Sequence, residues 1–144
     1  MRYCTHADIG RAIPELTLIQ LSNDDPAAVA PNESVIEDGV RQAEELVDGY
    51  LRGRYELPLV PVPTVLRDAV VYLARHWLYQ RRPEGALPDA VKDSRKDTIK
   101  LLESIRDGVV TLGMPSGQAT PEPGEIRVRG RRPQFGDDMW ERYR

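Results

Sequence analysis

The side chains that could carry covalent or metal chemistry are few in this sequence. Cysteine occurs once, as Cys4, and histidine only as His6 and His76. One cysteine excludes a disulfide within the chain, and these three residues lack the spacing of zinc ligands. No glycine-rich phosphate loop and no nucleophile elbow occurs either. The sequence therefore predicts no enzyme, no cofactor and no metal, and we expect a packed Cys4, a surface His6 and a partly buried His76.

Carboxylates are abundant, but their placement predicts a solvated surface rather than a catalytic acid–base pair. The 144 residues include 23 Asp and Glu against 20 Lys and Arg. Residues 1–113 hold 18 of the acidic and 14 of the basic residues, so this part of the chain is acidic and a poor general binder of nucleic acid. Four of the carboxylates recur on one side of a predicted helix: Glu33, Glu37, Glu44 and Asp48.

Basic residues gather near the C-terminus, in the run Arg127-Val128-Arg129-Gly130-Arg131-Arg132. This cluster is compatible with a solvated tail, with docking onto an acidic protein surface or with contact to nucleic acid. Alternating apolar and charged residues favour addition to a partner's sheet edge, and the aromatic residues that follow favour anchors in a partner's pocket. The candidate binding residues are Ile126, Arg127, Val128, Arg129, Arg131, Arg132, Phe135, Trp140 and Tyr143.

Two parts of the chain must position these groups. Residues 114–144 contain 4 Pro and 4 Gly and too few apolar residues to fold alone. We therefore expect a helical body, residues 1–113, and an extended C-terminal arm, residues 114–144.

The body is predicted to be mainly α, with about four helices and a proline-rich connector. Helical spacing of apolar residues predicts helices at about His6–Ile13, Glu33–Arg52, Val65–Arg81 and Ala90–Asp107, with one or two turns at Glu15–Leu21. The predicted N-caps are Thr5 (in a capping box with Asp8), Asn32 and Asp89, and Val109–Leu112 is a candidate short strand.

The broad apolar face of the helix at Val65–Arg81 predicts the most buried element, with Leu73 and Trp77 inside. Three prolines, Pro58, Pro61 and Pro63, exclude a helix in the segment that joins this helix to the preceding one. This connector should be extended, with its leucines and valines packed on the body.

The centre of the chain and several residues on either side of it form a distinctive pattern. The pattern comprises Met1-Arg2-Tyr3, Thr5, Asp8, Leu16 to Leu21, the run Asp48-Gly49-Tyr50-Leu51-Arg52-Gly53-Arg54-Tyr55-Glu56-Leu57-Pro58-Leu59, Val62-Pro63, Ala74-Arg75, Leu78-Tyr79, Arg82-Pro83 and Asp107-Gly108 to Leu112-Gly113. It resembles the small Mu-like phage and prophage family of head-completion proteins. The resemblance covers about residues 1–113, with His76 where an aromatic residue is more usual.

This resemblance implies a structural virion protein, the head–tail adaptor of a long-tailed phage. Such subunits form a ring, expected to contain twelve copies, beneath the portal protein. The ring extends the DNA channel and offers a platform for a stopper or tail-completion protein. DNA would pass without sequence-specific binding, and no membrane is involved. The protein would lie at the head–tail interface of the virion, and in the host cytoplasm during assembly.

The resemblance also assigns expected roles to residues. Four residues match the family pattern: Tyr50, Arg54, Tyr55 and Pro58. They would fix the link between the helices predicted at Glu33–Arg52 and Val65–Arg81. The carboxylates Glu33, Glu37, Glu44 and Asp48 are candidates to face the channel, because an acidic wall repels phosphate; an ordinary solvent-facing helix is the alternative. The arm would bind the portal or a neighbouring copy.

A different class remains as the alternative, a small helical DNA-binding regulator. It would need a basic recognition helix. The last predicted helix has four basic residues, Lys92, Arg95, Lys96 and Lys100, but four acidic residues interleave with them, Asp89, Asp93, Asp97 and Glu103. A gel shift at low salt separates the two, because only the regulator should bind DNA.

Overall fold

The structure is a computed structural model that describes residues 1–82 and 85–114, and within these residues the chain forms five helices and no strand. The mainly helical prediction is confirmed, and the short apolar piece after Pro14 is a helix of its own. The helices are α1 (His6–Ala12), α2 (Glu15–Ser22), α3 (Glu33–Leu51), α4 (Thr64–Gln80) and α5 (Asp89–Arg106). No helix in the described part of the chain is long and apolar enough to cross a membrane.

Local sequence signals set the starts of the first and third helices. The Thr5 side chain accepts from the backbone N–H of Asp8, and the Asp8 side chain accepts from the backbone N–H of Thr5, so the predicted capping box is present. The Asn32 side chain accepts from the backbone N–H of Val35 at the start of α3. The prediction for α5 is wrong by one residue: Pro88 is the N-cap, and Asp89 lies in the first turn.

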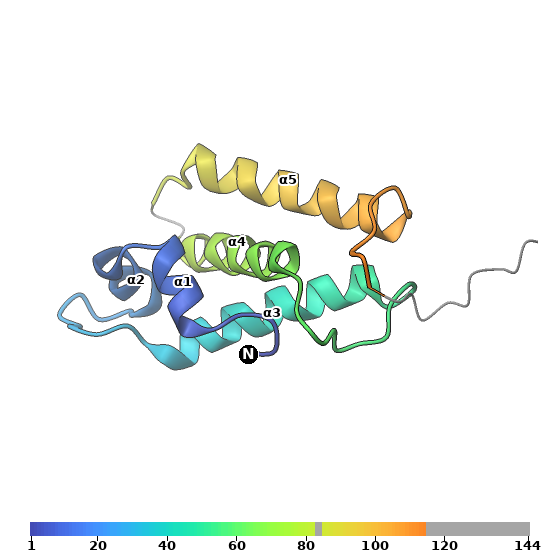
Figure 1. Cartoon of the computed structure of the whole chain (residues 1–144). Coiled ribbons are helices and arrows are strands. Elements are labelled where there is room, and N and C mark those ends of the chain that lie inside the picture. Colours follow the sequence, from blue (N-terminus) through green and yellow to red (C-terminus); the bar gives the residue numbers. More distant parts are fainter. Residues whose placement is uncertain (83–84, 115–144) are drawn as a thin grey trace, which may run out of the picture.

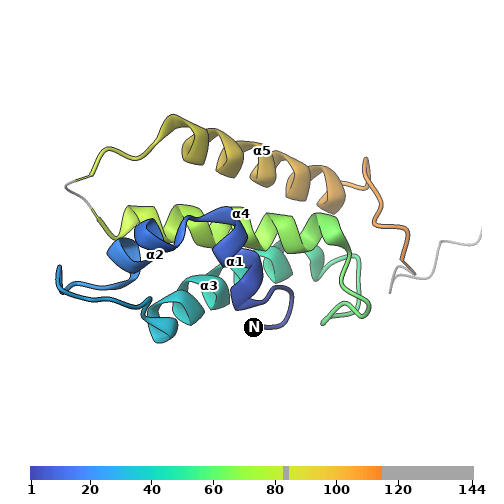
Figure 2. The same ribbon diagram turned by 60° about the vertical axis from the view of Figure 1, so that its left-hand side comes forward.

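The three long helices form the main body, with α4 between α3 and α5 (Figure 1). Helix α1 packs on α4, while α2 contacts both α3 and α4 at one end of the body. Figure 2 shows α1 and α2 on the same side of the body, away from the last turn of α5. The body is therefore longer than it is thick, and its two ends are built from different elements.

Helix α4 is buried along most of its length, as predicted. Four of its side chains are fully buried, those of Leu66, Val70, Ala74 and Leu78, and Leu73 is 5% exposed. Trp77 differs from the prediction, because it is only partly buried and packs against the edge of the core. The Trp77 indole is large and lies at the margin of the three-helix body, so part of it stays in contact with solvent.

The chain after α5 caps the helix instead of forming the expected strand at Val109–Leu112. Gly108 has a φ of 82°, which glycine adopts without the strain that a side chain would add. The backbone N–H groups of Val109 and Val110 both donate to the carbonyl of Ser104, at 2.9 and 3.1 Å. These carbonyl contacts use the donors that a strand would have needed.

The proline-rich connector runs from α3 to α4 without a helix, as predicted. The peptide bonds before Pro58 and Pro61 are both cis. Tyr55 and Leu59 are buried, whereas Val60 is 80% exposed. The expectation that the connector packs its apolar side chains on the body therefore holds for Leu59 and is wrong for Val60, which the chain turns outward.

Candidate functional site

The start of the chain is held by two carboxylates of α3. The backbone N–H groups of Arg2 and Tyr3 both donate to Glu44 Oε1, the second at 2.8 Å. The Tyr3 hydroxyl donates to Asp48 Oδ1 at 2.6 Å, and Arg2 Nη1 lies 2.8 Å from Asp48 Oδ2. We call these four residues the N-terminal clamp. It joins Arg2 and Tyr3 to the second half of α3 by charged hydrogen bonds.

The clamp corrects the idea that four carboxylates of α3 share one open face. Glu44 is 3% and Asp48 5% exposed, so neither presents a solvated carboxylate to a channel. Both carboxylates can be buried because the hydrogen-bond donors of the clamp replace the water around them. Glu33 and Glu37 are exposed, and Glu37 Oε1 lies 3.4 Å from His6 Nε2. A channel-facing role stays a prediction for these two residues.

Burial next to the clamp makes two groups hard to ionise. Burial, followed by the hydrogen bond to Asp48, raises the pKa of Tyr3 to about 12. Burial, followed by the charge of Glu44, raises the pKa of the Cys4 thiol to about 11. Cys4 is 5% exposed, so the prediction of a packed cysteine is confirmed. A thiol in this state is a poor nucleophile near neutral pH.

Three of the four residues that were expected to fix the connector contact the last residue of α5 or the chain that follows it. The Tyr55 hydroxyl accepts from the backbone N–H of Leu112 at 3.1 Å. The Arg106 guanidinium lies over the Tyr50 ring, 5.8 Å from its centroid. The Arg54 guanidinium lies directly against Gly108, in the space that a Cβ would fill. Pro58, the fourth residue, follows a cis peptide bond and is exposed.

The connector was expected to link α3 to α4, and the structure adds α5 to that link. The chain after α5 rests on Tyr55, just before the arm would begin. Nothing in the spacing of residues 50–58 pointed to α5, because the partners lie more than fifty residues further along the chain. These contacts fix the base from which residues 115–144 continue.

Two arginines at the end of α4, Arg81 and Arg82, hold the opposite end of the body, and the sequence analysis predicted no contact for either of them. Arg81 Nη1 donates to the carbonyl of Leu21 at 2.9 Å, and its Nη2 lies 3.2 Å from Asp24 Oδ1. Arg82 Nη2 donates to the carbonyls of Gln20, at 2.7 Å, and Asn23. Cations at the C-terminus of a helix complete its free carbonyls and match its dipole.

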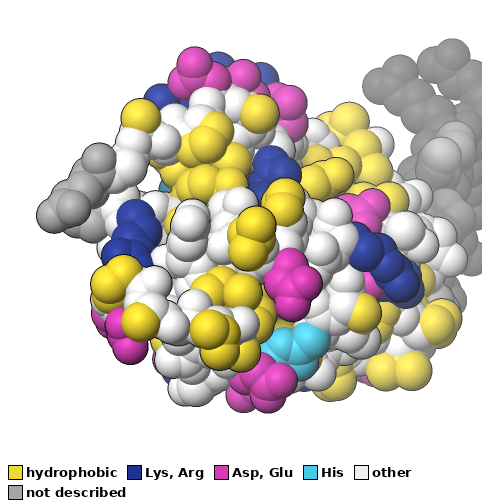
Figure 3. Space-filling model, turned by 90° about the vertical axis from the view of Figure 1, so that its left-hand side faces the viewer, with side chains coloured by type: hydrophobic (Ala, Val, Ile, Leu, Met, Phe, Trp, Pro, Cys, Tyr) yellow, Lys and Arg dark blue, Asp and Glu magenta, His cyan; other side chains and the backbone are white. Residues whose placement is uncertain are grey.

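Beside these arginines lies a groove of about 880 Å³, formed by α2, the loop that follows it and the end of α4. We call it the α2 groove. Leu16 and Val29 are 77% and 90% exposed along it. Asp24 and Asp25 add negative charge to the lining, and Arg82 adds one cation. Figure 3 faces this end of the molecule and shows separate groups of hydrophobic side chains with charged side chains between them.

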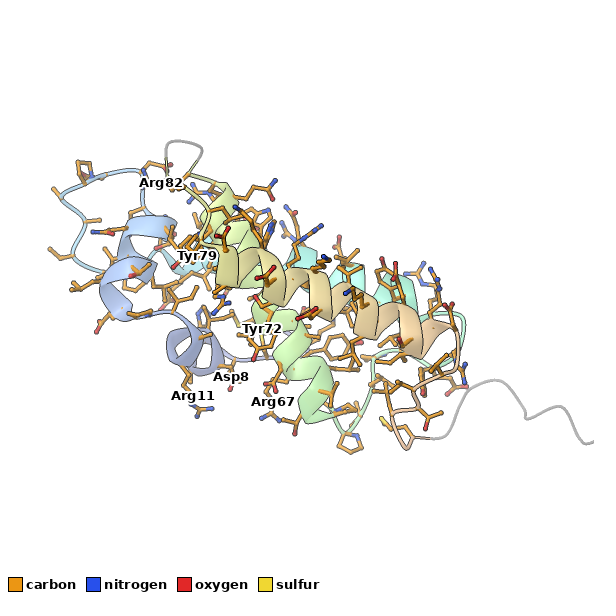
Figure 4. All side chains as sticks on the ribbon, turned by 90° about the horizontal axis from the view of Figure 1, so that it is seen from above. Asp8, Arg11, Arg67, Tyr72, Tyr79 and Arg82 are labelled. Atoms are coloured by element: carbon orange, nitrogen blue, oxygen red, sulfur yellow. The ribbon has the colours of Figure 1, made fainter. Side chains whose placement is uncertain are left out.

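A second charged face is shared by α1 and α4. Figure 4 shows Asp8 and Arg11 of α1 on the same side of the molecule as Arg67 and Tyr72 of α4. Arg11 Nη1 lies 3.1 Å from Asp8 Oδ1. The hydrogen bonds from Thr5 lower the pKa of Asp8, and the charges of Arg11 and Arg67 lower it further. One oxygen of the Asp8 carboxylate thus caps α1 through Thr5, and the other pairs with Arg11.

The remaining chemistry-bearing residues lie where the sequence placed them. His76 is partly buried, and burial, followed by the charge of Arg95, lowers its pKa. His6 is exposed. Among residues 1–82 and 85–114, no three His, Cys, Asp or Glu side chains are grouped to hold a metal ion. The predicted arm residues, Ile126, Arg127, Val128, Arg129, Arg131, Arg132, Phe135, Trp140 and Tyr143, lie outside the described residues.

Comparison with known proteins places this chain beside phage proteins. The family model described as "Bacteriophage Mu, Gp36" matches residues 3–130, which extends past the helical body. "Gene product J" of Escherichia phage Mu is 29% identical over 137 residues, which cover 94% of each protein. "Mu-like prophage FluMu protein gp36" of Haemophilus influenzae is 34% identical over 97 residues, or 67% of this chain and 66% of that protein.

Proposed function

The chain belongs to the bacteriophage Mu Gp36 family, and from this premise we propose that it is a structural virion protein that serves as a head–tail connector adaptor. Copies would form a ring beneath the portal protein, extend the DNA channel and provide the platform for a stopper or tail-completion protein. The protein would act without catalysis, at the head–tail interface of the virion. DNA would pass through the ring without sequence-specific contacts.

One observation supports a ring subunit above all others: the most exposed large apolar side chains lie at both ends of the body. Leu16 and Val29 lie at the α2 end, at 77% and 90% exposure. Val60 of the connector and Val109 after α5 are 80% and 81% exposed at the other end. Among the described residues, every other exposed large hydrophobic is at most 46% exposed. A subunit that contacts neighbours at both ends needs such apolar surface there.

The regulator alternative receives less support from helix α5. Lys92 Nζ lies 3.0 Å from Asp89, and Lys100 Nζ lies 4.0 Å from Asp97, each pair on the same helix. A recognition helix presents its basic side chains to phosphates and base edges instead. Each of these two lysines therefore has a carboxylate of its own helix beside it.

The proposal is tested by measuring mass in solution. Native mass spectrometry of the purified full chain, alone and mixed with its portal protein, should show a closed ring or an adaptor–portal complex. A chain that stays monomeric and never joins the portal would overturn the adaptor function. A gel shift at low salt completes the test, because tight binding to a DNA duplex would favour the regulator.

A further inference from the structure

We propose that the α2 groove binds the C-terminal segment, residues 126–143, of a second copy of this chain. The contact would be a heterologous one, in which the groove of each copy receives the segment of the next. It rests on the proposed function in one respect only, that the second copy is a ring neighbour. The argument uses the lining of the groove, the charge of both partners and the place where the described chain ends.

The groove has apolar side chains that nothing in the described part of the chain covers. Leu16 projects from the first turn of α2, and Val29 projects from the loop that returns toward α3. Both are far more exposed than the buried leucines of the same helix, Leu18 and Leu21, at 6% and 7%. Covering two such side chains removes apolar surface from water and is favourable.

The charge around the groove favours a basic occupant. Two acidic residues, Asp24 and Asp25, and one cation, Arg82, line the groove. Arg81 and Arg82 donate to the carbonyls at the end of α2, and Arg81 also pairs with Asp24, which leaves Asp25 without a cation among the contacts described. Asp25 lies on the groove and is exposed, and its Oδ1 accepts only the backbone N–H of Ala27 at 2.8 Å among the contacts described.

The C-terminal segment has the composition that such a groove requires. Residues 126–132 contain four arginines and no acidic residue, whereas the acidic residues of the segment, Asp137, Asp138 and Glu141, all follow this basic run. Ile126 and Val128 alternate with the first two arginines, and Phe135, Trp140 and Tyr143 follow. Apolar and aromatic side chains can cover the groove while the arginines pair with the carboxylates on its rim.

The position of the chain's end favours a neighbour over the same copy. The last described residues follow α5 and are held near Tyr55, at the end of the body opposite α2 (Figure 1). To reach its own groove, the chain would have to run back along the whole body. Residues 115–125 span about 40 Å at most when fully extended, and α5, with 18 residues, takes up about 27 Å of that length, which leaves little slack for a path around the body. A neighbour placed end to end brings its groove to the segment, and repetition of this contact closes a ring when the rotation between copies allows it.

A photo-crosslinking experiment on the full chain tests the proposal. Benzoylphenylalanine replaces Phe135, and in a second protein Tyr143, and each is mixed with an equal amount of 15N-labelled protein. After irradiation, mass spectrometry identifies the residues joined and whether both isotope labels are present. We expect crosslinks from the segment to residues 16–29, with both labels in one product.

Two matched variants sharpen the test. Val29→Lys removes the apolar surface and adds a charge that repels the arginines, so the yield of these crosslinks should fall at least about tenfold, which corresponds to about 1.4 kcal/mol. Leu46→Lys places the same charge on α3, at a side chain that is 40% exposed and does not line the groove, and should leave the yield of crosslinks to residues 16–29 unchanged. Circular dichroism confirms that both variants fold.

Several outcomes would overturn the inference. They are crosslinks confined to one isotope label, crosslinks to a different surface, or no loss with Val29→Lys. The adaptor function is judged separately by binding to the portal. Protein that joins the portal without groove crosslinks refutes only the inference, whereas groove crosslinks in a protein that never joins the portal refute the proposed function.

Discussion

The indole ring of Trp77 lies on Gly39, so that α4 approaches α3 with no side chain between ring and backbone. A Cβ added at Gly39 would come within 2.7 Å of Trp77 Cε3 and 3.1 Å of Cζ3. Both helices are fixed on other sides by buried residues such as Val40 and Leu78. Gly39 has a helical backbone, so its conformation does not require glycine. The close approach of Trp77 explains why glycine is found at this position.

The first prediction concerns this approach. Gly39→Ala should destabilise the protein by about 1–3 kcal/mol, because the ring must move away. Gly49→Ala, in the same helix, has no atom within 4 Å of the added Cβ. That control should instead stabilise the protein by about 0.5–1 kcal/mol, since alanine favours a helix over glycine. Urea unfolding measures both changes, and equal effects of the two substitutions would contradict the packing.

The second prediction compares two aspartates of α3 whose ion pairs have the same N···O distance. Asp48 Oδ2 lies 2.8 Å from Arg2 in the buried clamp, and Asp38 Oδ1 lies 2.8 Å from Arg41 at the surface. Asp48→Ala should cost about 1–3 kcal/mol, because it leaves the buried Tyr3 hydroxyl without its acceptor, whereas the half-exposed Arg2 side chain can return to water. Asp38→Ala should cost under about 1 kcal/mol. Thermal unfolding of both variants checks the ranking.

The third prediction concerns the connector and the end of α5. Tyr55→Phe removes only the acceptor of the Leu112 N–H and should cost about 0.5–1.5 kcal/mol. Tyr55→Ala also leaves a cavity, because Tyr55 is 5% exposed, and should cost about 3 kcal/mol or more. Amide exchange provides a direct readout: the Leu112 N–H should exchange faster in both variants. Unchanged exchange in Tyr55→Phe would show that the bond has no effect.

The fourth prediction is a loss of stability at alkaline pH. In the folded chain the pKa of Cys4 rises from 9.0 to about 11, and that of Tyr3 from 10.0 to about 12. The unfolded chain therefore loses these protons first, so stability is complete below about pH 9 and falls as the pH rises toward 12. Each group can contribute a slope of at most about 1.4 kcal/mol per pH unit.

Cys4→Ala isolates one of these two groups. Its stability should decline less steeply than that of the parent between pH 9 and 11, while the remaining decline reflects Tyr3. Urea unfolding at several pH values measures the slopes. Thiol reagents at pH 8 give a second readout, since Cys4 should react only after unfolding. Rapid labelling of the folded protein would contradict its burial.

Local signals in the sequence were sufficient for the helices and insufficient for the clamp. The Thr5–Asp8 capping box and the Asn32 cap involve residues three apart, so a sequence shows them directly. The partners of Glu44 lie 41 and 42 residues earlier in the chain. Helical spacing placed Glu44 on a polar side of α3, and no pattern could reveal that the chain's own start covers that side.

The same distinction explains the two ends of the body. The α5 stop at Gly108 was readable, because glycine after a helix is a local signal. Arg81 and Arg82 depend on carbonyls at residues 20–23, which only the folding of α4 against α2 brings near. The α2 groove follows from these contacts and was therefore invisible in the sequence.

The N-terminal clamp also sets an order of events during synthesis. Translation produces Arg2 and Tyr3 before Glu44 and Asp48, their acceptors in the second half of α3. These two residues consequently have no docking site until the ribosome has released residue 48. A peptide fused ahead of Met1 would join the body one residue before the backbone N–H groups that are bound to Glu44.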